Sequence, residues 1–88
     1  MATVVYTAGA KRQFDALPLP IKQRVEKIVI RLGAWPSVSG VKPLRGELAG
    51  QYRVRTGDYR VQFRVGGNGE LTIVTIVKVG HRDGFYEE

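Results

Sequence analysis

QYRVRTGDYRVQFRV, residues 51–65, is the stretch that decides the fold. Apolar and polar side chains alternate along both of its halves, and a period of two is typical of a β-strand with one buried face. Gly57-Asp58 stands between the halves and suits a two-residue turn. The stretch therefore predicts an antiparallel β-hairpin in which Arg55 lies directly opposite Arg60.

The two faces of the predicted hairpin differ in chemistry. The apolar face, which is expected to pack under helices, carries Tyr52, Val54, Thr56, Tyr59, Val61, Phe63 and Val65. The other face carries Gln51, Arg53, Arg55, Arg60, Gln62 and Arg64. Like charges opposite one another cost stability, and arginine can bind phosphate through two parallel hydrogen bonds. Two interpretations stay open for this face: a solvated surface that keeps the protein soluble, and a site for a phosphate backbone.

The rest of the chain supplies helices and further strands. Thr3–Tyr6 is rich in β-branched residues and predicts a strand, with Thr7 as the cap of a first helix. Pro20 suits the first residue of a second helix. Leu71–Val79 is apolar at nearly every position, which is typical of a strand covered on both faces in the centre of a sheet. The apolar positions at helical spacing are Ala10, Phe14 and Leu17, and then Ile21, Val25, Ile28, Val29 and Leu32.

Together these elements predict an α+β fold that forms a single domain over residues 1–88. Two N-terminal helices are expected on one face of a small, mainly antiparallel sheet of about four strands, in the order β-α-α-β-β-β. Residues 35–40, between the second helix and the hairpin, are interpreted as a surface loop that leads to residues 42–46.

The composition excludes several classes of protein. The chain has no cysteine, so disulfides and thiolate metal sites are excluded, and the single histidine, His81, lacks the partners that zinc needs. No stretch approaches the roughly 20 apolar residues of a membrane span. We therefore expect a cytoplasmic protein without a metal or other cofactor, and without a membrane as partner.

The positive charge is large and is concentrated in two segments. The formal net charge is +6, from 14 Lys and Arg against 8 Asp and Glu. Residues 11–31 and residues 42–64 each contain six basic and two acidic side chains. Such an imbalance favours association with a polyanion or with an acidic partner protein.

A polar and aromatic cluster follows the last predicted strand, and its sequence is Gly80-His81-Arg82-Asp83-Gly84-Phe85-Tyr86. Histidine moves protons near neutral pH, arginine stabilises a pentavalent phosphate, and tyrosine stacks on a base or carries a proton. His81, Arg82 and Tyr86 are therefore candidate catalytic residues. The alternative is a surface segment with an idle histidine and with aromatic side chains that only cover the edge of the core.

Five short motifs follow one another along the chain: Leu44-Arg45-Gly46, Tyr52-Arg53-Val54-Arg55, Gly57-Asp58-Tyr59-Arg60-Val61, Val79-Gly80-His81-Arg82 and a closing Tyr86. In this order and spacing they resemble the RelE/ParE toxin superfamily, and the resemblance spans essentially the whole chain. It implies the toxin component of a type II toxin-antitoxin system, held inactive in a hetero-oligomer with a cognate antitoxin. The arginines of the hairpin lead us to expect an antitoxin that is acidic where it crosses them.

The resemblance leaves two activities open. One activity implied by the resemblance is that of the RelE-like toxins, which are ribosome-dependent mRNA interferases. They cleave mRNA in the ribosomal A site without metal, by attack of a ribose 2′-hydroxyl on the adjacent phosphate. ParE-like toxins instead inhibit DNA gyrase by binding and have no nuclease activity, and the fold alone does not choose between the two. A gyrase inhibitor does not need histidine, arginine and tyrosine beside an arginine face. We therefore predict a RelE-like endoribonuclease, with the ribosome and mRNA as partners, and keep gyrase inhibition as the alternative.

The resemblance also implies roles for individual residues. Arg60 and Arg82 match arginines that bind the scissile phosphate, and Tyr86 matches a tyrosine linked to base stacking or proton transfer. Arg53 and Arg55 match basic active-site residues, and because arginine holds its protons too tightly to act as a base, both are expected to stabilise charge. Proton removal then falls to the histidine or the tyrosine of the C-terminal cluster, or needs no base. The full catalytic set is Arg53, Arg55, Arg60, His81, Arg82 and Tyr86, and the expected RNA-binding residues are Lys42, Arg45, Arg53, Arg55, Arg64 and Lys78.

Overall fold

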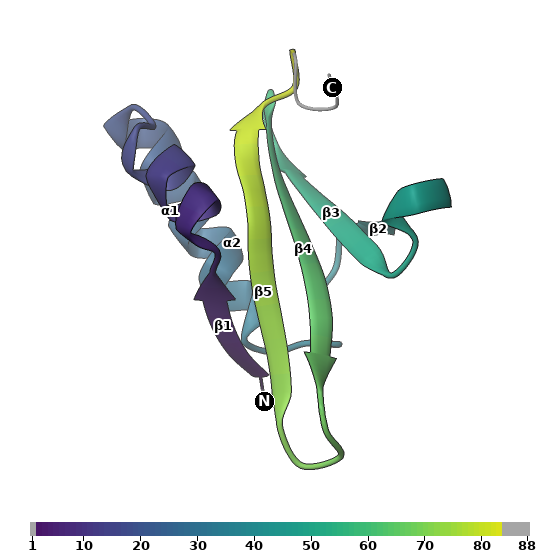
Figure 1. Ribbon diagram of the computed structural model, residues 1–88. Helices are drawn as coiled ribbons and strands as arrows, with labels where there is room; N and C mark the ends of the chain where they lie inside the picture. Colours follow the sequence, from purple (N-terminus) through teal and green to yellow (C-terminus); the bar gives the residue numbers. More distant parts are fainter. Residues whose placement is uncertain (1, 84–88) are drawn as a thin grey trace.

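A computed structural model describes residues 2–83 as two helices packed on a five-stranded sheet (Figure 1). The elements, in chain order, are β1 (Ala2–Tyr6), α1 (Ala8–Asp15), α2 (Leu19–Leu32), β2 (Val41–Pro43), the 3-10 helix η1 (Gly46–Leu48), β3 (Gln51–Thr56), β4 (Tyr59–Gly67) and β5 (Thr72–His81). The strands lie in the order β1-β5-β4-β3-β2. β1 and β5 pair in parallel, and the other neighbouring strands pair antiparallel. The predicted α+β fold is confirmed.

β2 is a strand that the sequence did not predict. Val41–Pro43 pairs antiparallel with β3 and forms one edge of the sheet. Its register places Lys42 opposite Arg53. The sheet therefore has one more strand than expected, and that strand brings a further lysine to the arginine-bearing side.

Both helices begin at or next to the predicted residues. The Thr7 hydroxyl oxygen accepts a hydrogen bond from the backbone N–H of Ala10 at 3.1 Å, and a cap of this kind stabilises a helix by about 1 kcal/mol. α2 begins at Leu19, so Pro20 occupies the second helical position. The first four N–H groups of a helix have no partner within it, so the missing N–H of Pro20 costs no helix hydrogen bond. Among residues 2–83, no helix is long and apolar enough to cross a membrane.

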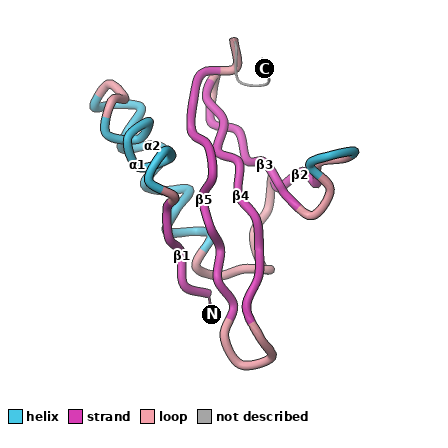
Figure 2. Tube along the Cα trace, in the orientation of Figure 1, coloured by secondary structure: helices cyan, strands magenta, loops and turns pink. Residues whose placement is uncertain are grey.

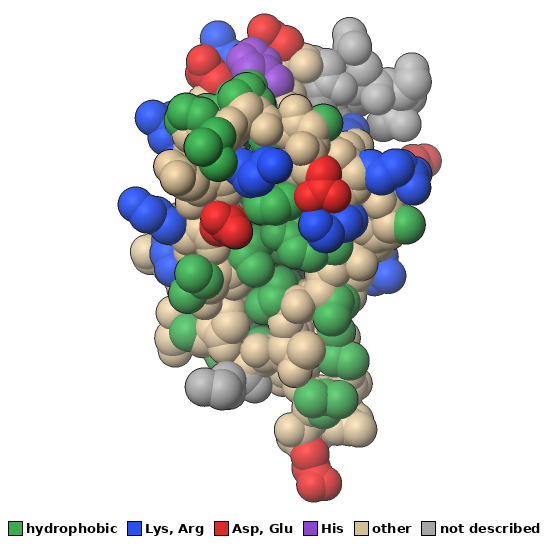
Figure 3. All heavy atoms as spheres, turned by 90° about the vertical axis from the view of Figure 1, so that its left-hand side faces the viewer, with side chains coloured by type: hydrophobic (Ala, Val, Ile, Leu, Met, Phe, Trp, Pro, Cys, Tyr) green, Lys and Arg blue, Asp and Glu red, His purple; other side chains and the backbone are tan. Residues whose placement is uncertain are grey.

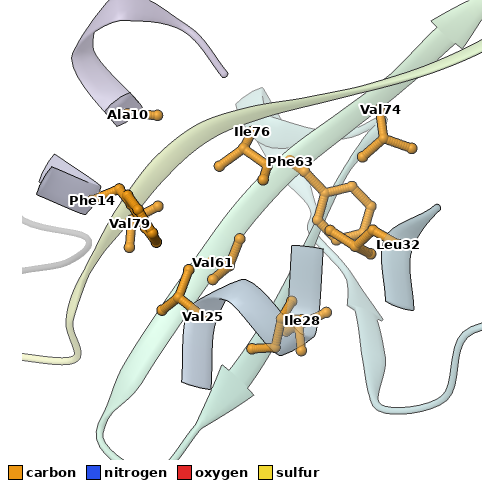
Figure 4. Packing of buried hydrophobic residues seen from close by; sticks show 11 residues of the cluster. Ala10, Phe14, Val25, Ile28, Leu32, Val61, Phe63, Val74, Ile76 and Val79 are labelled. Atoms are coloured by element: carbon orange, nitrogen blue, oxygen red, sulfur yellow. The ribbon is translucent and has the colours of Figure 1, made fainter. Parts of the chain in front are cut away.

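The hydrophobic core lies between the two helices and one face of the sheet (Figure 2). The helices contribute Ala10, Phe14, Val25, Ile28 and Leu32, and the sheet contributes Val54, Val61, Phe63, Val74, Ile76 and Val79. Figure 4 shows the side chains of α2 and of the strands pointing toward one another. Each large apolar side chain that is fully buried contributes about 1.5 to 3 kcal/mol. This burial fixes which face of the β3–β4 hairpin turns away from the helices.

β5 differs from the predicted strand in two ways. The helices cover one of its faces only, where Val74, Ile76 and Val79 are buried, whereas Ile73, Thr75 and Val77 on the other face are half-buried. A register shift occurs opposite Gln62 and Phe63, so that Val77 is the extra residue of a β-bulge. The bulge exchanges the two faces of β5, because a strand alternates with a period of two. Val79 rather than Lys78 therefore enters the core.

Candidate functional site

The side of β3 and β4 that faces away from the helices carries the predicted basic cluster. Gln51 lies opposite Arg64, Arg53 opposite Gln62, and Arg55 opposite Arg60, as the hairpin predicts. Lys42 of β2 continues the row of Arg53 and Gln62 on one side, and Lys78 of β5 continues it on the other. We use the term arginine face for Lys42, Gln51, Arg53, Arg55, Arg60, Gln62, Arg64 and Lys78.

Two guanidinium groups at the centre of the arginine face are partly buried. Arg53 Nε and Arg60 Nη1 are out of contact with solvent, and neither has a hydrogen-bond partner among residues 2–83. A buried donor without an acceptor is costly, and more so when the group is charged. An anion with several acceptor oxygens removes this cost. Arg55 and Arg64, by contrast, are exposed and extend the positive surface on either side.

Among residues 2–83, Gln62 is the only polar residue that is buried, with an exposed fraction of 6%. Its Nε2 donates a hydrogen bond to Oε1 of Gln51 on β3. The register places the cations Arg53 and Lys78 on either side of Gln62. A neutral amide thus occupies the position where a further cation would be most strongly repelled.

His81 lies on the other side of the sheet from the arginine face. It pairs with Tyr59, and the two rings meet edge to face with centroids 5.1 Å apart at 87°. Tyr59 and Val61 are two residues apart on β4, so their side chains point to the same face of the sheet, where Val61 is fully buried under the helices. The backbone N–H of Asp83 donates to His81 Nδ1 at 3.1 Å, and an Asp83 carboxylate oxygen lies 3.6 Å from the same nitrogen. The structure therefore does not bring His81 together with the arginine face.

Arg82 is held at the turn between β3 and β4. Its backbone N–H donates to the carbonyl oxygen of Asp58 at 2.7 Å. The Arg82 Nε atom lies 3.8 Å from a carboxylate oxygen of Asp58 and 3.7 Å from one of Asp83. The sequence predicts only a turn position for Asp58. Its pairing with Arg82 depends on where β5 ends, which no local pattern indicates.

The remaining predicted residues lie at the margin or beyond the described part of the chain. Arg45 is exposed and precedes the first residue of η1. Tyr86 falls outside the described residues 2–83. Within this range no three His, Asp or Glu side chains gather closely enough to hold a metal ion.

Comparison with known proteins places the chain in a family. The model of the family described as "ParE toxin of type II toxin-antitoxin system, parDE" matches residues 4–84. The chain belongs to the RelE/ParE toxin superfamily. This confirms the relationship indicated by the order of the sequence motifs.

Relatives of this RelE/ParE superfamily toxin cover nearly its full length. Toxin RelG from Mycobacterium tuberculosis is 39% identical over 85 residues, which span 96% of this chain and 94% of the relative. A chain of the toxin-antitoxin complex RelBE2 from the same organism is 38% identical and superposes with a TM-score of 0.77, covering 92% of this chain and 98% of that one. The archaeal RelE-RelB complex from Pyrococcus horikoshii contains a similar chain at 26% identity, with a TM-score of 0.73 over 92% of this chain and 94% of that one.

A second surface of this toxin, on the helix side, has apolar side chains at its centre with charged side chains around them (Figure 3). Two hollows of about 520 and 460 Å³ share Ile30 of α2, which is 76% exposed. Tyr6 lines one of them beside Glu26. Burial raises the pKa of the Tyr6 phenol, and the charges of Glu26 and Asp15 raise it further. This surface contains none of the predicted site residues.

Proposed function

We propose that this toxin is a RelE-like, ribosome-dependent endoribonuclease that cleaves mRNA in the A site without metal. The proposal depends mainly on two buried guanidinium nitrogens, on Arg53 and Arg60, which have no hydrogen-bond partner in the described part of the chain and lie on a strongly basic sheet face. Phosphate oxygens are acceptors suited to such donors. The 39% identity to Toxin RelG, a protein named with the Rel toxins, supports the same branch.

In the proposed reaction the ribose 2′-oxygen attacks the adjacent phosphorus, the bond from phosphorus to the 5′-oxygen breaks, and a cyclic phosphate forms. Arg60 and Arg82 bind the non-bridging phosphate oxygens, on which negative charge increases in the transition state. Arg53 and Arg55 stabilise the same charge and remain protonated throughout. The outer contacts with the RNA backbone come from Lys42, Arg45, Arg64 and Lys78.

The proton of the 2′-hydroxyl must leave during this attack, and the leaving 5′-oxygen must gain one. Tyr86 remains the proposed residue for this transfer, with a reaction assisted by no protein base as the alternative. The sequence also predicts His81 as a residue for this transfer. Its contact with Tyr59 on the opposite side of the sheet favours a role in holding the end of β5 rather than in direct proton removal.

The proposal is tested by adding the purified toxin to translating ribosomes with a defined mRNA and mapping the ends of the message. Three proteins are compared: the wild type, Arg60→Ala, and Lys27→Ala as a control that removes an exposed cation from α2. Cuts at the A-site codon by the wild type and by Lys27→Ala, but not by Arg60→Ala, are expected. A message left intact by all three proteins would reject the nuclease.

Inhibition of DNA gyrase is the second candidate function, because the matching family model is the one described for ParE toxins. A ParE-like toxin would block supercoiling by binding the enzyme and would leave mRNA uncut. A supercoiling assay with the same three proteins separates the two functions. Inhibition by the wild type together with an intact message would assign the protein to the ParE-like branch.

An acidic antitoxin is the proposed partner, in a cytoplasmic hetero-oligomer. The solved relatives from Mycobacterium tuberculosis and Pyrococcus horikoshii are toxin-antitoxin complexes. The net charge of +6 and the arginine face favour a partner with carboxylates that compete with phosphate. Co-expression with an acidic protein encoded beside this toxin should restore growth, and the two should purify together. Failure of any such neighbour to restore growth would contradict this assignment.

A further inference from the structure

Asp58 is an acidic residue at the end of the arginine face, and the fold brings it to Arg82. The last paired residues of β4 and β5 are Tyr59 and His81. The hydrogen bond of 2.7 Å from the Arg82 N–H to the Asp58 carbonyl oxygen extends this pairing by one residue. Asp58 lies in the turn just before β4 and Arg82 just after β5, so the two residues are one pair beyond Tyr59 and His81 and two pairs beyond Arg60 and Gly80.

The side chains of the two residues also interact. Arg82 Nε lies 3.8 Å from the Asp58 carboxylate. This contact is an ion pair at the Nε end of the guanidinium group, and it does not occupy the two terminal nitrogens, Nη1 and Nη2, with which arginine can bind another anion. Asp83 lies at a similar distance from Nε, but its side chain is more exposed than that of Asp58, at 80% against 60%. Asp58 is in addition fixed by the hairpin turn that leads into Arg60.

We propose that Asp58 is a positioning residue, which holds Arg82 so that its terminal nitrogens point to the scissile phosphate. This inference rests on the proposed nuclease function and on the role of Arg82 in it. Asparagine and aspartate both suit a tight turn, so the turn itself does not require a charge at this position. The carboxylate is needed for the contact with Arg82. Asp58→Asn therefore removes the interaction while keeping the turn.

Loss of positioning and loss of negative charge have different kinetic effects. Asp58→Asn makes the surface more positive, so the affinity for RNA stays the same or increases, and KM does not rise. The turnover rate falls because Arg82 is no longer held in the productive orientation. Arg82 and Asp58 are more than half exposed, so the expected fall in kcat is about threefold, in the range of exposed ion pairs. A structural role of Asp58 would instead raise KM and lower the melting temperature.

The experiment measures cleavage of ribosome-bound mRNA by the full-length toxin and four variants: Asp58→Asn, Asp58→Glu, Arg82→Gln and the double variant Asp58→Asn/Arg82→Gln. Glu70→Gln serves as the control, because it removes one exposed negative charge from the turn between β4 and β5. We expect a lower kcat for Asp58→Asn, partial recovery for Asp58→Glu, and no change for Glu70→Gln. In the Arg82→Gln background, Asp58→Asn should have no further effect.

The outcomes separate this inference from the proposed function. If the wild type cleaves and Asp58→Asn cleaves at the same kcat, the positioning role is wrong while the nuclease stands. If Asp58→Asn lowers kcat by the same factor in the wild-type and in the Arg82→Gln background, Asp58 acts on something other than Arg82. This result would also overturn the inference. An intact message with the wild type would reject the nuclease, and the inference with it.

Discussion

Arg55 and Arg60 face one another directly across the β3–β4 hairpin. Like charges in such a pair lower the stability of the folded state, so Arg55→Gln is expected to raise the free energy of unfolding by about 0.5 kcal/mol at low ionic strength. Added salt should reduce the difference from the wild type, because it screens the repulsion. Urea unfolding at two salt concentrations measures both effects, with the exposed Arg45→Gln as the control. A destabilised Arg55→Gln protein would mean that the pair is not repulsive.

Removal of a guanidinium that is proposed to bind the scissile phosphate should have a large effect on cleavage and a small one on folding. Arg60→Ala and Arg82→Ala are each expected to lower kcat by about 10² to 10³, the usual cost of losing a preorganised donor to transition-state charge. Circular dichroism and the melting temperature check that the fold is retained. A fully active variant at either position would remove that residue from the proposed mechanism.

The arginine face should give RNA binding a steep dependence on salt. Each phosphate contact with a single strand contributes about 0.7 to the slope of log K against log salt concentration. Arg64→Ala should lower the slope by one such contribution, because Arg64 is an exposed cation of this face. Fluorescence anisotropy with a non-cleavable oligonucleotide measures it, and Lys27→Ala provides the matched change on α2. Equal slopes for the wild type and Arg64→Ala would place the RNA elsewhere.

Gly67 is required by the turn that follows β4. Its φ is +117°, and a Cβ atom at this position would overlap the carbonyl oxygen of Leu71. Gly67→Ala is therefore expected to lower the free energy of unfolding by about 2 kcal/mol or more. Gly69→Ala, in the same turn, meets no atom within 4 Å and should change stability by less than about 0.5 kcal/mol. Equal stability of the two variants in thermal unfolding would contradict this account of the turn.

Tyr6 should make stability depend on pH in alkaline solution. Burial raises the pKa of its phenol above the ordinary value of 10.0, so the folded protein binds this proton more tightly than the unfolded chain does. The resulting stability is complete below the ordinary value and is lost as the pH rises through the higher pKa of the folded state. Tyr6→Phe should show a smaller loss of stability than the wild type in this range. Urea unfolding between about pH 9 and pH 11 compares them.

Local patterns were sufficient to predict the hairpin and the residues at which the helices begin. The alternation of residues 51–65, with glycine and aspartate at the turn, determines the register that brings Arg55 to Arg60. Thr7 caps α1 as expected because a hydroxyl before a helix satisfies a free N–H. The basic cluster could therefore be assembled from the sequence, residue by residue.

Features that depend on distant parts of the chain could not be predicted in this way. β2 has three residues, one of them a proline, and three residues are too few to show a period. The bulge at Val77 arises where β5 pairs with β4, and it exchanges the faces of every residue that follows. Without the bulge, alternation counted from Val74 would place His81 beside the arginines. The separation of His81 from the arginine face, and the meeting of Asp58 with Arg82, both follow from this long-range pairing.

The parallel pairing of β1 with β5 joins the first described residues of the chain to some of the last, with Ala2 beside Thr72 and Tyr6 beside Ile76. During synthesis, β1 has no partner strand until these late residues have left the ribosome. Contacts between residues so distant in sequence form slowly, because a long loop must close first. A chain that stops short of β5 therefore has an incomplete sheet, in which β1 and β4 each lack a neighbouring strand. The topology thus makes β5 the strand that joins the N-terminal part of the fold to the sheet that carries the arginine face.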